Sequence, residues 1–221
     1  IYITAGAIVL GAPIAIFTSL YMAFFAPRAV LRLLQPAVSL LAGIPSVIYG
    51  LFGLTVLVPF VRDFFGIKLG MDGDGFSMFT ASVMLGIMIL PTIISVGESA
   101  IRAVPNSYYE GALALGATHE RSVFFTVIPA AKSGIMAGVI LGIGRAIGET
   151  MAVIMIAGNQ PRMPKGIFEG VRTMTSNIVI EMGYATDLHR EALIATAVVL
   201  FVFILLINLL FSLVKRRGAN A

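Results

Sequence analysis

Four long stretches without a charged residue constrain this chain more than any other feature of its sequence. They cover residues 1–27, 33–61, 75–97 and 192–214. A helix that crosses a bilayer needs about 20 predominantly apolar residues, because the hydrocarbon core is ~30 Å thick and each residue rises ~1.5 Å. Each stretch is therefore long enough to span a membrane.

A fifth apolar stretch, residues 133–157, is also long enough to span but contains Arg145 and Glu149. We interpret it as a span with two functional or paired charges. The chain is 58% hydrophobic and only 12% charged, which excludes an ordinary soluble enzyme and a disordered chain. The sequence predicts an all-α polytopic membrane protein, a single domain over residues 1–221, with spans at about 1–26, 35–61, 76–97, 133–157 and 192–214.

The charged residues between the spans predict the orientation of the chain. One side of the membrane receives residues 26–32, 98–132 and 215–221, where Lys and Arg lie close to the span ends and outnumber the acids. The other side receives residues 62–74 and 158–191, which hold at least as many acids as bases. Because positive loops stay in the cytoplasm, residues 98–132 are predicted to form a cytoplasmic loop and residues 158–191 an external loop. The C-terminus is then cytoplasmic.

The predicted cytoplasmic loop contains the signals of a short helix that ends in a tight turn. Ser107 and Glu110 have the spacing of a capping box, which predicts a helix over 108–115 with Ser107 as its N-cap. Gly116 follows at the point where a helix end favours the left-handed backbone conformation.

A second short helix is predicted after this turn. Thr118 is a candidate N-cap, and Pro129 is expected to end or kink the helix. The loop then forms a helix–turn–helix on the cytoplasmic face. The residues leave two interpretations equally open, a surface loop that only connects two spans or a docking element for a cytoplasmic partner.

The two charges of the fifth stretch share a helix face with glycines. At ~100° per residue, Gly138, Gly142, Arg145 and Glu149 fall within one narrow sector, with Gly134 beside it. Small residues at this spacing let another helix approach closely, so the three glycines are predicted to be helix-packing residues. The charges then face the same helix–helix junction, away from lipid.

Arg145 and Glu149 are therefore candidate residues of a substrate pathway. A charge at mid-bilayer depth costs at least ~2.5–3.5 kcal/mol and usually serves a function. The Arg145 guanidinium carries a planar fork of donors that suits an oxyanion. The alternative is an i,i+4 ion pair that neutralises itself and serves packing only. The order of the pair weakens this alternative, because acid before base is the better orientation on a helix.

Two further features leave their roles open. Pro45 lies inside a predicted span among glycines, and it marks either a broken helix on a substrate route or an ordinary membrane-helix proline. Ser46 and Tyr49 beside it are possible hydroxyl donors to an anion. In the external loop, residues 167–182 are predicted to form a short amphipathic helix. This helix is either a cap on the outer mouth or part of a docking surface, and the alternative is that the segment is a plain ordered loop.

The predicted cytoplasmic loop resembles the EAA loop of ABC importer permeases, a coupling helix that sits in a cleft of the ATPase subunit. The matching residues are Glu110, Gly111, Ala112, Gly116 and Pro129. Gly111 stands where the consensus has Ala, and Thr126 stands where it has Ile. The resemblance implies that this loop couples the chain to an ATPase.

Further stretches narrow the resemblance to the phosphate-specific importer permeases of the PstC type. They are residues 42–50, 90–94, 144–153 and 171–175. The resemblance covers essentially the whole chain and implies a type I ABC importer transmembrane domain, with five spans present of an expected six. We expect the first span of the family to be missing, in keeping with a chain that starts at Ile1 without a methionine. The matching Arg145 and Glu149 are implicated in phosphate translocation in that family.

The resemblance also implies a set of partners at the bacterial inner membrane. They are a PstA-like second permease, two cytoplasmic ATPase subunits and an external phosphate-binding protein, without nucleic acid. The chain has no Walker A sequence, so it is expected not to be an enzyme, with ATP hydrolysis supplied by the partners. Without cysteine and with two isolated histidines, no metal or cofactor is expected. The alternative is an ATP-independent secondary anion transporter or channel, which would be expected to show inverted repeats; the sequence shows none.

Overall fold

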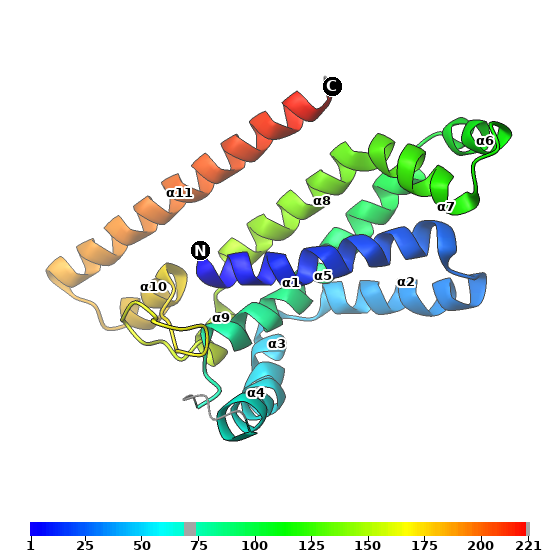
Figure 1. The fold of residues 1–221 in the computed structure, drawn as a ribbon. Coiled ribbons are helices and arrows are strands. Elements are labelled where there is room, and N and C mark those ends of the chain that lie inside the picture. The colour runs from blue at the N-terminus through cyan, green and yellow to red at the C-terminus, as the bar shows by residue number, and fades with distance from the viewer. Residues whose placement is uncertain (69–73, 220–221) are drawn as a thin grey trace.

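The computed structural model describes residues 1–68 and 74–219, with side chains described as far as residue 209. This part of the chain is almost entirely helical (Figure 1). Five helical segments are long and apolar enough to cross a membrane, namely Tyr2–Phe25, Ser46–Lys68, Met78–Arg102, His119–Gly148 and Asp187–Leu209. The prediction of an all-α chain with five membrane helices is therefore confirmed. The side chains of the predicted basic tail, residues 215–221, lie outside the described residues.

Helix α5 (Met78–Arg102) is the centre of the bundle. Helix α1 (Tyr2–Leu20), which a π-helical turn extends to Phe25, packs along it, and α8 (Ile128–Gly148) also packs against it. The approach of α1 is close, because a Cβ added at Gly11 would lie 2.7 Å from the carbonyl oxygen of Gly86 in α5. Apolar side chains surround α5 on most of its faces, as expected for a helix that is buried within a bundle.

The predicted single span over 35–61 is wrong, because the structure divides it into two helical segments. Helix α2 (Arg28–Gly43) lies alongside α1 (Figure 1). The chain then turns and continues through α3 (Ser46–Phe52) and α4 (Val58–Val61). One π-helical turn joins these two helices, and another extends the segment to Lys68. The break falls at Ile44, whose ψ of 125° is extended. Pro45 explains it, since a proline disfavours the helical conformation of the residue before it.

The predicted span over 133–157 is also wrong as a single helix. Helix α8 ends at Gly148, and the short α9 (Met151–Ile156) follows after an extended residue. At its other end the helical segment begins earlier than predicted, at α7 (His119–Ser122), which a π-helical turn over Val123–Val127 joins to α8.

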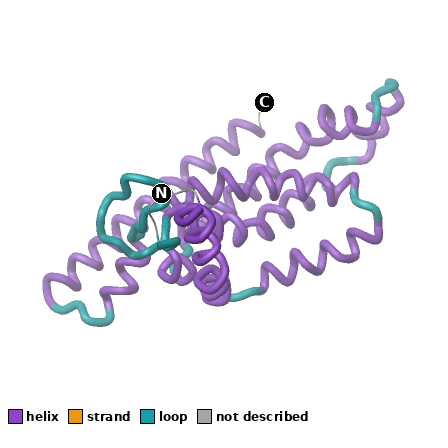
Figure 2. Tube along the Cα trace, turned by 60° about the horizontal axis from the view of Figure 1, so that its bottom comes forward, coloured by secondary structure: helices purple, strands orange, loops and turns teal. Residues whose placement is uncertain are grey.

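The two ends of the bundle carry different connections. Helix α6 (Asn106–Ala114) and α7 lie at one end, and α10 (Met174–Met182) lies with a long irregular segment at the other, where Figure 2 shows much of the loop structure. We call these the α6 end and the α10 end. The predicted helix over 167–182 is wrong in its first half, because Val171 forms an isolated β-bridge with Gly158 and the helix begins only at Met174.

The C-terminal helix α11 (Asp187–Ala219) runs from the α10 end back along the outside of the bundle (Figure 1). It packs against α10 and α8. Arg172 braces this region, with its Nη1 2.7 Å from Oε1 of Glu181 and its Nε donating to the carbonyl oxygen of Asn159 at 3.0 Å. Hydrogen bonds from the Tyr184 hydroxyl and from Arg172 hold the pKa of Glu181 below its usual value.

Candidate functional site

The break between α8 and α9 is organised by Glu149. This residue has an extended backbone, with φ of −70° and ψ of 128°. Its Oε1 accepts hydrogen bonds from the backbone N–H groups of Thr150 and Ala152, each at 3.1 Å. A carboxylate is favourable at this position, because the first turn of a helix has unpaired N–H groups and a partial positive charge. Glu149 thus starts α9 instead of continuing α8.

This break changes the predicted relation between Arg145 and Glu149. The prediction that both lie on one face of a continuous helix is wrong, because Gly148 is the last residue of α8. No ion pair joins the two side chains among the pairs found in the described part of the chain. The alternative of a self-neutralising i,i+4 pair therefore does not apply to this structure.

Arg145 is partly buried and points to α5. Its Nη1 lies 3.4 Å from Oγ1 of Thr92, which follows Pro91 in the middle of α5. A guanidinium has five N–H donors, and this long bond is the one side-chain hydrogen bond of Arg145 to the described residues. The rest of the fork is thus available to another acceptor. Sequence reasoning did not single out Thr92, although the stretch 90–94 that contains it carried part of the resemblance.

The three predicted packing glycines of α8 all lie against α5. A Cβ at Gly142 would lie 2.8 Å from Ile93, and one at Gly138 would lie 3.2 Å from Val96. A Cβ at Gly134 would overlap the side chain of Ala100. The backbones of α8 and α5 therefore approach each other along this line, which positions Arg145 one turn beyond Gly142 on the same side.

The second broken helix packs directly against α9. A Cβ at Gly50 of α3 would lie 2.6 Å from Sδ of Met155 and 3.0 Å from Cα of Ala152. The hydroxyl of the buried Tyr49 donates to the carbonyl oxygen of Leu41 at 2.9 Å, across the break from α3 to α2. The breaks at Pro45 and Glu149 thus precede two helices that pack together. The hydroxyl of Tyr49 thus already donates to an internal partner in this structure. Its role as a donor to an anion remains a prediction.

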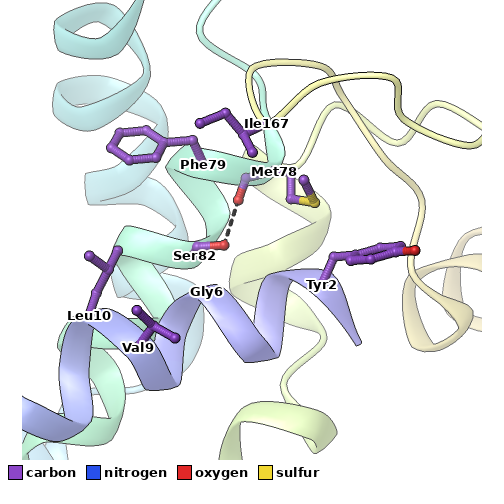
Figure 3. Close-up of a pocket in the computed structure, with 8 residues that line it drawn as sticks. All are labelled: Tyr2, Gly6, Val9, Leu10, Met78, Phe79, Ser82 and Ile167. Atoms are coloured by element: carbon purple, nitrogen blue, oxygen red, sulfur yellow. Dashed lines mark hydrogen bonds between the residues drawn. The ribbon is translucent and has the colours of Figure 1, made fainter.

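A separate groove lies between α1 and α5 near the start of the chain (Figure 3). It has a volume of about 240 Å³, and its lining residues are Tyr2, Gly6, Val9, Leu10, Met78, Phe79, Ser82 and Ile167. Ser82 donates its hydroxyl to the carbonyl oxygen of Met78 at 2.8 Å, so its polar group is internally satisfied. The groove has no charged side chain and includes none of the predicted site residues.

The helix–turn–helix predicted between the third and fourth spans is present at the α6 end. Helix α6 begins at Asn106 with Pro105 as its N-cap and no side-chain cap, so the predicted capping box of Ser107 and Glu110 is wrong. The restricted backbone of Pro105 already sets the helix start. Gly116 has the predicted left-handed conformation, with φ of +84°. Next to it, the N–H of Ala117 donates to the carbonyl oxygen of Ala112 at 3.1 Å, which closes α6.

The second helix of this element begins as predicted but does not end at Pro129. Thr118 caps α7 by accepting a hydrogen bond from the backbone N–H of Arg121 at 3.3 Å. The helix then continues through the π-helical turn into α8, with Pro129 in the first turn of α8. The widened turn accommodates the proline, which has no N–H to donate.

Most of the predicted coupling residues are exposed. Glu110, Gly111 and Gly116 face solvent, Ala112 is half-buried, and α6 has no buried residue. Leu115, at the end of α6, is 90% exposed. This element therefore presents its surface outward at the α6 end of the bundle.

An aromatic cluster attaches this element to the end of α1. The Tyr109 hydroxyl and Nδ1 of His119 are 2.7 Å apart, which ties α6 to α7. The ring of Phe24 lies 5.6 Å from that of Tyr109, and Phe25 meets His119 edge-on at 5.0 Å. Sequence reasoning missed this cluster, because its members are far apart in the chain and no local pattern joins them.

Known proteins resemble this chain over most of its length. Residues 15–219 match the family described as "Binding-protein-dependent transport system inner membrane component". The chain is 40% identical over 209 residues to the "Probable ABC transporter permease protein YqgH" of Bacillus subtilis, which covers 92% of this chain and 66% of that protein. It is 35% identical over 226 residues to the "Phosphate transport system permease protein PstC" of Haemophilus influenzae, which covers 96% of this chain and 72% of that protein. The chain thus spans about two thirds of the length of these curated relatives.

Two solved structures are similar in fold. One is an inward-facing conformation of the MetNI methionine ABC transporter, with a TM-score of 0.75 and 18% identity over 98% of this chain and 91% of that chain. The other is an amino acid ABC transporter crystallised with histidines, with a TM-score of 0.62 and 20% identity over 97% and 88%. The fold is therefore that of a type I ABC importer transmembrane domain, as the sequence predicted.

Proposed function

The chain belongs to the family of binding-protein-dependent transport system inner membrane components, and on that premise we propose that it is the pore subunit of an ATP-driven importer of inorganic phosphate. Members of this family are membrane permease subunits and are not themselves catalytic. The similarity to PstC of Haemophilus influenzae supports phosphate as the substrate.

The observation that carries this proposal is the position of Arg145. It lies on a membrane helix beside a break, with a single long bond to Thr92 among the described residues. A guanidinium within the bilayer needs an acceptor, and an oxyanion supplies oxygens that match its fork. We therefore assign Arg145 to the substrate pathway. Glu149 belongs to the pathway as the residue that breaks the helix next to Arg145.

The exposed element at the α6 end is proposed to couple the pore to ATP hydrolysis. Glu110, Gly111, Ala112, Gly116 and Pro129 would form the loop that docks on an ATPase subunit. This proposal makes the α6 end and the C-terminus cytoplasmic, because residues 26–32, 98–132 and 215–221 together hold eight Lys and Arg against three Glu. The complete transporter would then contain a PstA-like second permease, two ATPase subunits and an external phosphate-binding protein in the bacterial inner membrane.

Uptake of radiolabelled phosphate into vesicles tests the proposed function. The assembled transporter is reconstituted with its phosphate-binding protein on the external side and with ATP on the ATPase side. We expect uptake only when ATP is present, and we expect excess unlabelled phosphate, but not sulfate, to suppress it. Uptake that follows a proton gradient without ATP would instead favour a secondary transporter.

A further inference from the structure

Helix α2 carries a row of polar side chains along one face. Arg28, Arg32, Gln35 and Ser39 recur at intervals of four, three and four residues, which places them on the same side of the helix. All four side chains are exposed. We call these four residues the polar face of α2.

The other two faces of α2 are apolar. Leu31, Leu34 and Val38 pack into a core cluster with residues of α1 and α5. Leu33 and Leu40 are 73% and 72% exposed and lie roughly 120° around the helix from the polar face. The face with Leu33 and Leu40, the leucine face, can contact lipid, and the face with Leu31, Leu34 and Val38 contacts the rest of the protein. The polar face suits neither of these surroundings.

The polar face runs from the end of the bundle where α2 begins, with Gln35 at the level of Glu98 near the end of α5, to Ser39 deeper in the bundle. Val38 shares a core cluster with Ala12 and Ala15, which belong to the middle of the spanning helix α1. Figure 1 shows α2 running alongside α1, not across its end. Ser39 follows Val38 in the sequence, so contact with hydrocarbon would leave its hydroxyl unsatisfied at this depth. Water or a polar partner must therefore cover Ser39.

The polar face is also positively charged. Arg28 and Arg32 make no ion pair with any residue that the structure describes. Among the described residues, the one carboxylate bonded to this face is that of Glu98, whose Oε1 lies 3.5 Å from Nε2 of Gln35. Glu98 is already paired with Arg102 at 2.9 Å. An anion that moves along α2 therefore meets two guanidinium groups whose charge no described carboxylate neutralises.

The deep end of the polar face leads to the neighbourhood of Arg145. Val38 of α2 belongs to the same core cluster as Ala146, the residue after Arg145. The bond from Tyr49 to Leu41 holds the end of α2 close to α3, which packs on α9 just beyond the break at Glu149. The polar face thus extends from the end of the bundle where α2 begins toward the proposed substrate residue.

We propose that the polar face of α2 lines the cytoplasmic half of the path that an oxyanion follows after it leaves Arg145. The charge and direction of the substrate in this inference rest on the proposed function. A half-helix that ends at a break inside the bilayer suits this position, because irregular and polar backbone occurs there only around a water-filled cavity or within protein. Arg28 and Arg32 lower the electrostatic barrier for an anion that passes them.

Cysteine accessibility tests the polar face directly, because the chain has no cysteine of its own. Gln35→Cys and Ser39→Cys are introduced singly into the assembled transporter with cysteine-free partner subunits. Inside-out vesicles are then treated with an anionic, membrane-impermeant methanethiosulfonate. We expect both positions to react at least about tenfold faster than Leu33→Cys and Leu40→Cys, because a thiol in apolar surroundings ionises poorly. We also expect inorganic phosphate to slow the reaction of Ser39→Cys.

Several outcomes would overturn the inference. Equal reaction rates at the polar and leucine positions would remove the distinction between the faces. Protection from the reagent at both Gln35→Cys and Ser39→Cys in the assembled transporter would place a partner subunit on the polar face. The absence of any effect of phosphate on Ser39→Cys, in a variant that transports phosphate in the uptake assay, would show that the path lies elsewhere. Because the reaction pattern does not depend on the substrate, the expected pattern without phosphate uptake would contradict only the proposed function.

A charge substitution gives an independent readout. Arg32→Gln is expected to lower the rate of phosphate uptake severalfold and to weaken its dependence on ionic strength, while Arg32→Lys retains both. An uptake rate and salt dependence in Arg32→Gln equal to those of the unmodified transporter would contradict the assigned role of the charge.

Discussion

The break at Glu149 and the exposed turn at Gly116 differ in what satisfies their polar groups. At the break, Glu149 accepts from the backbone N–H groups of Thr150 and Ala152 and Arg145 bonds to Thr92, so the chain itself provides the partners. At the turn, α6 has no buried residue and Leu115 is 90% exposed. Polar groups inside the bilayer must be satisfied by the chain, by its substrate or by water in a cavity, whereas those outside have bulk water until a partner arrives.

Loss of Arg145 is the most severe test of the break. Arg145→Ala is expected to reduce phosphate uptake by at least about thirtyfold, the equivalent of ~2 kcal/mol, because the fork of donors for the anion is removed. Labelled phosphate uptake measures this, and copurification of the partner subunits checks assembly. Arg145→Lys keeps the charge without the fork and should give an intermediate rate. If Arg145→Ala instead prevents assembly, Arg145 serves packing.

A bulky residue at Gly116 tests the turn. Gly116→Leu is expected to separate ATP hydrolysis from uptake, because a side chain at φ of +84° strains the turn by ~1–2 kcal/mol and changes how α6 is presented. The ratio of phosphate taken up to ATP hydrolysed measures the effect. Gly183→Leu is the matched control, since Gly183 has a φ of −68° and both positions have open space for a Cβ. A normal ratio in Gly116→Leu would contradict the coupling proposal.

A smaller change tests how the turn is attached to the bundle. Tyr109→Phe removes the 2.7 Å hydrogen bond to His119 but keeps the ring beside Phe24. Because one such bond contributes about 0.5–1.5 kcal/mol, we expect uptake per ATP to fall by roughly two- to tenfold. Tyr108→Phe provides the control, because Tyr108 is 52% exposed. The same decrease in both variants would mean that the bond to His119 is not what attaches α6.

The smallest effect is expected when Glu149 keeps an acceptor but loses its charge. In Glu149→Gln the amide oxygen still accepts from Ala152, so we expect uptake within about threefold of normal. Glu149→Ala removes the oxygen that accepts both hydrogen bonds and should lower the thermal stability of the complex by the equivalent of ~0.5–2 kcal/mol. Uptake rates and thermal unfolding of the two variants separate these effects. Complete loss of uptake in Glu149→Gln would show that the charge itself is needed.

Sequence reasoning predicted those parts of the molecule that depend on short-range chemistry. The left-handed conformation of Gly116 and the cap at Thr118 follow from local backbone preferences, and both are present. The predicted capping box at Ser107 failed because Pro105 offered a competing way to begin the same helix. Even where the signals are local, the residue at which a helix begins therefore depends on which of two neighbouring start signals is the stronger.

The breaks were harder to predict. The stretch 133–157 is apolar enough to be one helix, and no local rule requires Glu149 to leave it. The carboxylate is favourable at the break because it bonds to the start of α9, and α9 is held in place by α3 through Gly50. The partners Thr92 and His119 were missed for the same reason, since each meets its partner only after distant helices have packed.

By itself, the sequence determined that this chain forms membrane helices, and how many, because the length of an apolar stretch is a local property. Only the tertiary structure decided which of those helices is central. Helices α5 and α11 are both apolar and long. In an apolar stretch of 18 residues, however, 61% of the residues of α5 are buried in the protein and only 6% of those of α11. The physical reason is that apolar side chains are equally compatible with lipid and with a neighbouring helix, so close packing at small residues such as Gly11 and Gly142 selects the neighbours.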